Sequence, residues 1–160
     1  MSDHPLITPE ILAAEMDKVE AARQIAWKFK PRPSQWEILR APERFLVGFC
    51  GRRFGKTMIA TRWIVEQAIQ TQGMTWWVAP TYAASMRAWR QMLQYLPREY
   101  RTVYKAERRI ELTAGGMVEF HSADNPDALR GEGLTAAVMD EAGSSRREAL
   151  ARSLDSSQLL

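Results

Sequence analysis

The segment that most constrains the fold covers residues 45–57, with the sequence Phe-Leu-Val-Gly-Phe-Cys-Gly-Arg-Arg-Phe-Gly-Lys-Thr. An apolar run is followed by a turn rich in glycine and arginine, and then by Gly55, Lys56 and Thr57. This order is typical of a triphosphate-binding loop of the Walker A type. Glycines let backbone N–H groups approach the phosphates at a helix N-terminus, a lysine reaches the β- and γ-phosphates, and a hydroxyl binds magnesium.

The match to the pattern G-x-x-x-x-G-K-[ST] has one departure. Cys50 occupies the position of the first glycine, and Gly51 comes one residue late. Taken alone, the segment is therefore as compatible with an ordinary turn as with a nucleotide site. The context that would support a nucleotide site is a preceding strand, a following helix and a distant acidic partner. The sequence offers all three.

Composition sets the broad class. The chain has 160 residues, of which 46% are hydrophobic and 26% charged, so we expect one α/β domain with a hydrophobic core. The net charge of +3 fits a polyanionic partner and equally fits an ordinary basic surface. Cys50 is the only cysteine, which excludes an intramolecular disulfide and favours a reducing, cytoplasmic setting. No apolar run reaches the length of a membrane span.

Helical patterns alternate with apolar strand patterns, which predicts a largely parallel sheet flanked by helices, with right-handed crossovers. The expected helices cover residues 8–28, 34–39, 56–70 and 85–96. The expected strands cover residues 45–49, 75–79, 109–113, 117–121 and 134–139. Residues 109–121 have the pattern of one β-hairpin that turns at Gly115 and Gly116.

Two acids follow the last expected strand. Asp140 and Glu141 come directly after residues 134–139. Ligands of parallel sheets bind beyond the carboxyl ends of the strands, so we expect Asp140 to hold magnesium beside Thr57. Glu141 is then the candidate that orients or deprotonates an attacking water. Acids are also favoured at a helix N-terminus, but together with the 45–57 segment the pair favours a nucleotide hydrolase.

Further candidate ligands lie before and inside the loop. The amide of Gln35 could contact the edge of an adenine ring, although it could also be an exposed polar group on a short helix. Arg52 could reach the γ-phosphate in cis and neutralise charge in the transition state, although a surface ion pair is its alternative role. The expected nucleotide-binding loop residues are Gly51, Arg53, Phe54, Gly55, Lys56 and Thr57.

Four motifs together resemble the ATPase domain of tailed-phage terminase large subunits, the motors that pump double-stranded DNA into procapsids. They are residues 50–57, Ala79-Pro80-Thr81, residues 125–131 and residues 138–142. The resemblance implies a P-loop NTPase-type fold. It also implies a role for each candidate: Arg52 as the cis arginine, Lys56 and Thr57 as phosphate and magnesium ligands, Asp140 as the second magnesium ligand, Glu141 as the catalytic carboxylate and Gln35 as the adenine contact.

The same resemblance implies ATP and Mg²⁺ as cofactors and double-stranded DNA as a partner. For the intact family it implies the portal protein and the small terminase subunit as further partners, and a homo-oligomeric ring. It also implies no membrane association and a location in the bacterial cytoplasm of the host of a phage or prophage. We expect a helical segment at 1–30, an incomplete ATPase core at 31–142 and a polar helical tail at 143–160. The tail departs from the family, which suggests a truncated or frameshifted product without a nuclease domain and with part of the sheet uncovered.

Two other interpretations stay open. Glutamine, phosphate loop and Asp-Glu occur in the same order in superfamily-2 helicases and translocases. The chain could also be a non-catalytic remnant that binds nucleotide without turnover. Residues 82–101, which are aromatic and basic, could face a DNA duplex or could form a helix that covers the sheet and exposes arginines.

Overall fold

The computed structural model describes residues 25–48, 50–124 and 133–142, together with Asp17, Glu20 and Ala22. These three single residues are helical, which agrees with part of the expected helix at 8–28, whereas residues 25–28 are not helical and the expectation is wrong there. The remainder of that helix before residue 25, the 125–131 motif and the tail at 143–160 lie outside the described residues.

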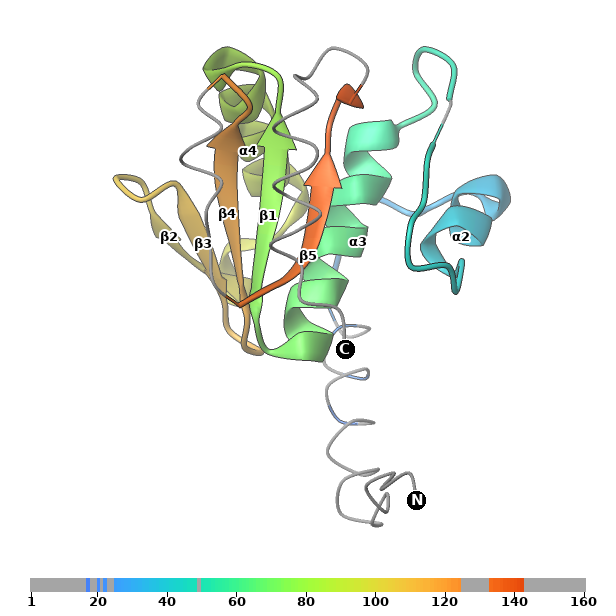
Figure 1. The fold of residues 1–160 in the computed structure, drawn as a ribbon. Helices are drawn as coiled ribbons and strands as arrows, with labels where there is room; N and C mark the ends of the chain where they lie inside the picture. Colours follow the sequence, from blue (N-terminus) through green and yellow to red (C-terminus); the bar gives the residue numbers. More distant parts are fainter. Residues whose placement is uncertain are drawn as a thin grey trace, which may run out of the picture.

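The described part is a mixed α/β structure with a five-stranded sheet in the order β2-β3-β4-β1-β5 (Figure 1). The strands are β1 (Met74–Ala79), β2 (Arg101–Tyr104), β3 (Arg109–Leu112), β4 (Met117–Ser122) and β5 (Leu134–Met139). The helices are α2 (Pro33–Leu39), α3 (Lys56–Thr71) and α4 (Tyr82–Tyr95), with a 3₁₀ turn at Arg98–Tyr100. The prediction of an α/β fold with a helix-flanked sheet is confirmed, and the expected hairpin is present as β3 and β4.

The expectation of a largely parallel sheet is wrong for the described strands. The central strand β1 pairs in parallel with β4 and β5, whereas β2, β3 and β4 form an antiparallel meander. Short turns can only join antiparallel neighbours, because a parallel pair needs a long crossover. The sequence analysis missed β2, which adds a third strand to the expected hairpin.

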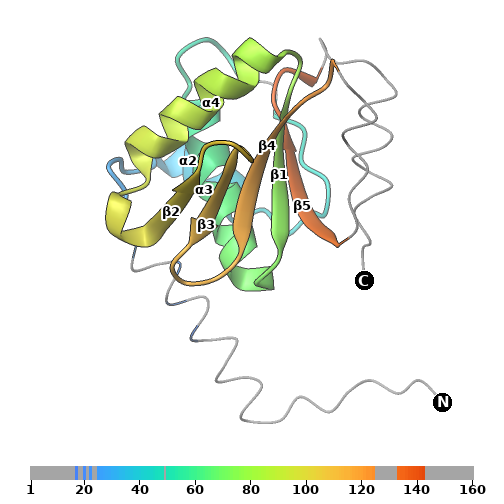
Figure 2. The same cartoon turned by 90° about the vertical axis from the view of Figure 1, so that its left-hand side faces the viewer.

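Helices α3 and α4 cover the same face of the sheet (Figure 2). Aromatic residues fill the layer between helices and sheet. The rings of Trp77 and Phe120 stack with centroids 6.2 Å apart, and Trp89 of α4 meets Phe120 edge-on at 5.2 Å. On the opposite face of β1, Trp76 and Val78 are buried with Ala123 and Leu134. The central strand is therefore buried on both faces, as its apolar run predicted.

Both ends of α4 are stabilised by polar side chains. The hydroxyl of Thr81 accepts a hydrogen bond from the backbone N–H of Ala84 at 3.2 Å, so the helix begins at Tyr82, three residues before the expected start. At the other end, the Arg101 guanidinium donates to the carbonyl oxygens of Leu96 and Leu93, both at 2.9 Å. An arginine from β2 thus satisfies carbonyls that a helix C-terminus leaves without partners.

The strand expected at 45–49 is the main error in the described region. Residues 45–48 form no strand, and Phe49 is not described. Phe45, Leu46 and Val47 are 58%, 42% and 78% exposed. The segment runs beyond the edge of β5 that faces away from β1, and no described strand lies between them (Figures 1 and 2). A strand needs a neighbour to complete its hydrogen-bond ladder, and here none is paired with it.

Candidate functional site

The loop before α3 curls tightly between Cys50 and Gly55. The backbone N–H of Phe54 donates to the Gly51 carbonyl at 3.4 Å, and the N–H of Ile59 donates to the Gly55 carbonyl at 3.1 Å, which starts the helix. Arg53 and Gly55 both have positive φ angles, 64° and 90°. Gly55 is needed in this conformation because the left-handed region strains a residue with a Cβ.

The N-terminus of α3 is open to an anion. No side chain caps it, and no acidic residue lies in its first turn. The first backbone N–H groups of a helix have no partners within the helix and carry the positive end of the helix dipole. Lys56 and Thr57 occupy the first two positions of α3. The Lys56 ammonium donates to the Cys50 carbonyl at 3.2 Å and so reaches across the loop from its end to its start.

Gln35 holds the loop against α2. Its side chain is only 1% exposed, its Nε2 donates to the Phe54 carbonyl at 2.6 Å, and its Oε1 accepts from the backbone N–H of Arg32 at 2.9 Å. The alternative of an exposed polar residue is therefore wrong. Both amide atoms of Gln35 are engaged within the protein here, and its contact with adenine stays a prediction.

Arg32 is a loop contact that the sequence analysis missed. Its Nη2 donates to the same Phe54 carbonyl at 2.8 Å, and its guanidinium lies over the Phe54 ring, 5.5 Å from the centroid. The only sequence signal was its place directly before Pro33, the first residue of α2. The loop is thus fixed through a backbone carbonyl, which leaves no pattern in the sequence.

Asp140 lies at the tip of β5, where its backbone N–H donates to the Val78 carbonyl at 2.8 Å. Burial raises the pKa of Asp140 above its ordinary value, and the neighbouring Glu141 raises it further. The charges of Lys56 and Arg87 oppose this shift, so both cations lie within electrostatic reach of the Asp140 carboxylate. The fold therefore brings the loop lysine and the strand-tip acid to one end of the sheet.

Among the other predicted site residues, Phe54 and Thr57 are partly exposed and both loop arginines are exposed. Arg52 and Arg53 lie on the outer turn of the loop without a partner among the described residues. Glu141 is also exposed and has a φ of 51°. Within the described residues, no three His, Cys, Asp or Glu side chains gather as a metal site. Thr57 and Asp140 suit Mg²⁺, which keeps several waters and commonly takes one or two protein ligands plus phosphate oxygens.

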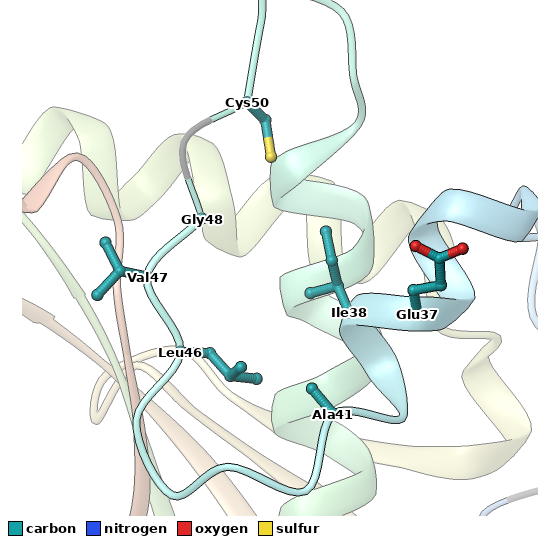
Figure 3. A pocket seen from close by; sticks show the side chains of 7 residues that line it. All are labelled: Glu37, Ile38, Ala41, Leu46, Val47, Gly48 and Cys50. Carbon is teal, nitrogen blue, oxygen red and sulfur yellow. The ribbon is translucent and has the colours of Figure 1, made fainter.

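A hollow of about 380 Å³ lies between α2 and residues 46–50. Figure 3 shows Ile38 and Leu46 lining it from its two sides, with the Cys50 sulfur directed towards α3. Glu37 is the one charged residue among its lining residues. An apolar hollow whose single charge is negative does not suit a phosphate, so the helix N-terminus is the better candidate for an anion site.

Comparison with known proteins decides the fold. No protein-family model and no curated protein matches the sequence. Among solved structures, the large terminase ATPase domain of Thermus phage P74-26 superposes with a TM-score of 0.65 at 19% identity, covering 92% of this chain and 65% of that chain. A point mutant of the same domain gives 0.66 at 18% identity, covering 93% and 66%. This chain has the fold of a large terminase ATPase domain.

The chain spans slightly less than two thirds of the length of those terminase domains. At this level of identity the likeness establishes the fold alone. None of the helices within the described residues combines the length and apolar character needed to cross a membrane.

Proposed function

We propose that the chain is the ATP-binding and ATP-hydrolysing domain of a viral terminase large subunit, which powers packaging of double-stranded DNA. The observation that carries this proposal is that Lys56, at the uncapped N-terminus of α3, lies within electrostatic reach of Asp140, at the tip of β5. A cationic loop, free helix N–H groups and a partly buried carboxylate at one end of a sheet suit a magnesium-bound triphosphate. The structural likeness to terminase ATPase domains supports the same class.

Each residue then has a distinct role. The backbone of the 50–55 loop and Lys56 bind the phosphates, Thr57 and Asp140 hold Mg²⁺, and Glu141 activates the attacking water. Bound Mg²⁺ neutralises phosphate charge during transfer. The exposed Arg52 is free to turn towards the γ-phosphate, and Gln35 links the loop to the nucleotide base.

The wider assignment follows the same class. Residues 31–142 form the ATPase core, and the partners are double-stranded DNA, the portal protein and the small terminase subunit. The working form is a homo-oligomeric ring in the cytoplasm of a bacterial host.

Binding of a fluorescent ATP analogue with magnesium tests the proposal. We expect Lys56→Ala to weaken binding at least tenfold, which corresponds to about 1.4 kcal/mol. Lys105→Ala is the matched control, because Lys105 is an exposed lysine in the β2–β3 turn. Equal affinities of the two variants would contradict the phosphate site.

Hydrolysis separates an active ATPase from a binding remnant. In the assigned roles, Glu141→Gln leaves analogue binding intact and lowers steady-state turnover by at least 10²-fold, the scale of general base catalysis. Turnover that is unchanged by Glu141→Gln would remove Glu141 from the mechanism.

A further inference from the structure

The outward face of α4 carries positive charge and no negative charge. The helix contains no acidic residue, and its inner residues pack into the core. Arg87, Arg90 and Gln94 are exposed on the other side, and Gln91 is partly exposed. Positions three and four apart lie on one face of a helix, so these side chains form a single stripe. Figure 2 shows α4 running across the sheet at the outside of its helical layer.

The four side chains also line one open hollow of about 440 Å³. We propose that this surface, the α4 face of Arg87, Arg90, Gln91 and Gln94, contacts the phosphate backbone of double-stranded DNA. The inference rests on the proposed function for the identity of the polyanion. The residues themselves supply the recognition, because guanidinium and amide groups donate hydrogen bonds to phosphate oxygens.

The arginines of the α4 face differ from the structural arginines of the chain. Arg62 binds Glu66 at 2.7 Å and lies over the ring of Trp36, with a separation of 4.6 Å. Arg101 caps α4 through two carbonyl oxygens. Arg87 and Arg90, by contrast, make no hydrogen bond or ion pair with another described residue. Their donors are available to an external anion.

The shape of the face suits a duplex backbone better than a lipid surface. Arg87 and Gln94 are seven residues apart, which is about 10 Å along the helix axis. A duplex carries one phosphate per about 1.7 Å of its axis, so this length meets several phosphates. A membrane-binding helix would present apolar side chains between the arginines. On α4 the apolar side chains Trp89 and Met92 are buried in the core.

The α4 face begins near the nucleotide site. Helix α4 follows β1 after Pro80 and Thr81. The positive charge of Arg87 acts to lower the pKa of Asp140. The N-terminal end of the α4 face therefore lies at the same end of the sheet as the candidate phosphate site. This placement would let one helix respond to both ligands.

Fluorescence anisotropy with a short labelled DNA duplex, without nucleotide, tests the inference over a series of salt concentrations. The double variant Arg87→Gln/Arg90→Gln should weaken binding of unrelated duplexes to a similar degree. It should also reduce the slope of log K against log salt by about 2, because each lost phosphate contact removes about 0.9. The matched control is Arg40→Gln/Arg44→Gln, which removes the same charge from exposed positions directly after α2.

Equal slopes for the α4 double variant and wild type, or an equal loss in the control, would overturn the inference. Competition by polyglutamate as strong as that by DNA of equal charge would overturn it in favour of an acidic protein partner. The Arg90→Gln variant alone should retain ATP-analogue binding, and Lys56→Ala should retain duplex binding. Failure of the ATPase proposal is thus distinguishable from failure of the DNA inference. It would abolish analogue binding but leave duplex binding dependent on the α4 face.

Discussion

Single residues decide the shape of the 50–55 loop, and Gly55 is the clearest case. Its φ of 90° strains any residue with a Cβ, and an added Cβ would lie 2.9 Å from Nε2 of Gln35. We expect Gly55→Ala to lower the free energy of unfolding by about 1–2 kcal/mol, measured by urea denaturation. Gly51→Ala is the control, because a Cβ there meets nothing within 4 Å. Equal losses in both variants would show that the conformation of Gly55 is not the cause.

His121 gives the fold a pH dependence. Its ring lies 4.6 Å from the ring of Trp76, and its Nε2 is 3.2 Å from a carboxylate oxygen of Glu119. Burial lowers the pKa of His121 below 6.5 and outweighs Glu119, which raises it, while the charge of Arg108 lowers it further. The unfolded chain then binds the proton more readily than the folded one.

The stability that His121 contributes is therefore present above its ordinary pKa of 6.5 and is lost as the pH falls through the lowered value. We expect the free energy of unfolding to decrease from about pH 7 to about pH 5. The His121→Gln variant should show a flatter profile in the same urea titrations. A profile as steep as that of wild type would assign the pH dependence to other groups.

At this scale the sequence offers candidate residue types for one site, but it does not show how the loop is held in place. Lys56 and Asp140 were expected at one site because Lys56 opens a helix after a glycine-rich turn and Asp140 directly follows an apolar strand. The contacts of Arg32 and Gln35 with the Phe54 carbonyl were missed, because any residue supplies a backbone carbonyl. Sequence patterns describe side chains, whereas this loop is held by hydrogen bonds to its main chain.

At the scale of elements, α4 depends on a side chain from the neighbouring strand. Arg101 donates to two carbonyl oxygens at the C-terminal end of the helix. Replacing it with glutamine removes charge-assisted hydrogen bonds, and we expect a loss of about 1–2 kcal/mol in urea denaturation. Arg98→Gln is the control, because Arg98 is exposed and carries the same charge close to Arg101, where it lowers the pKa of Arg101. A comparable loss in the control would indicate a general charge effect.

The elements predicted correctly are those whose partners are close in sequence or whose pattern is long. Helix α3 and the β3–β4 hairpin lie within one or two residues of the expected bounds. Strand β2 was missed because it is four residues long and alternates only weakly in burial. The strand expected at 45–49 failed for a different reason. Its apolar composition suits a strand, but a strand forms only beside a neighbour, and composition does not specify that neighbour.

At the scale of the whole molecule, the two edges of the sheet are unlike. Strand β2 ends one side with polar residues, whereas β5 ends the other side with the uncharged sequence Leu-Thr-Ala-Ala-Val-Met. Phe45, Leu46 and Val47 lie exposed beyond that second edge. An edge without charges that pairs with no other described strand, beside exposed apolar side chains, is a template for association with another chain.

We therefore expect the protein to associate as its concentration rises, measured by sedimentation velocity, and to do so through the β5 side. Val47→Lys should reduce this association without lowering the urea midpoint, because Val47 is 78% exposed and packs against little. Thr102→Lys adds the same charge to an exposed position on β2 and should leave association unchanged. If both variants reduce association equally, net charge controls it. If neither does, the contact lies elsewhere, and the exposed segment at 45–48 is tolerated as an ordinary loop.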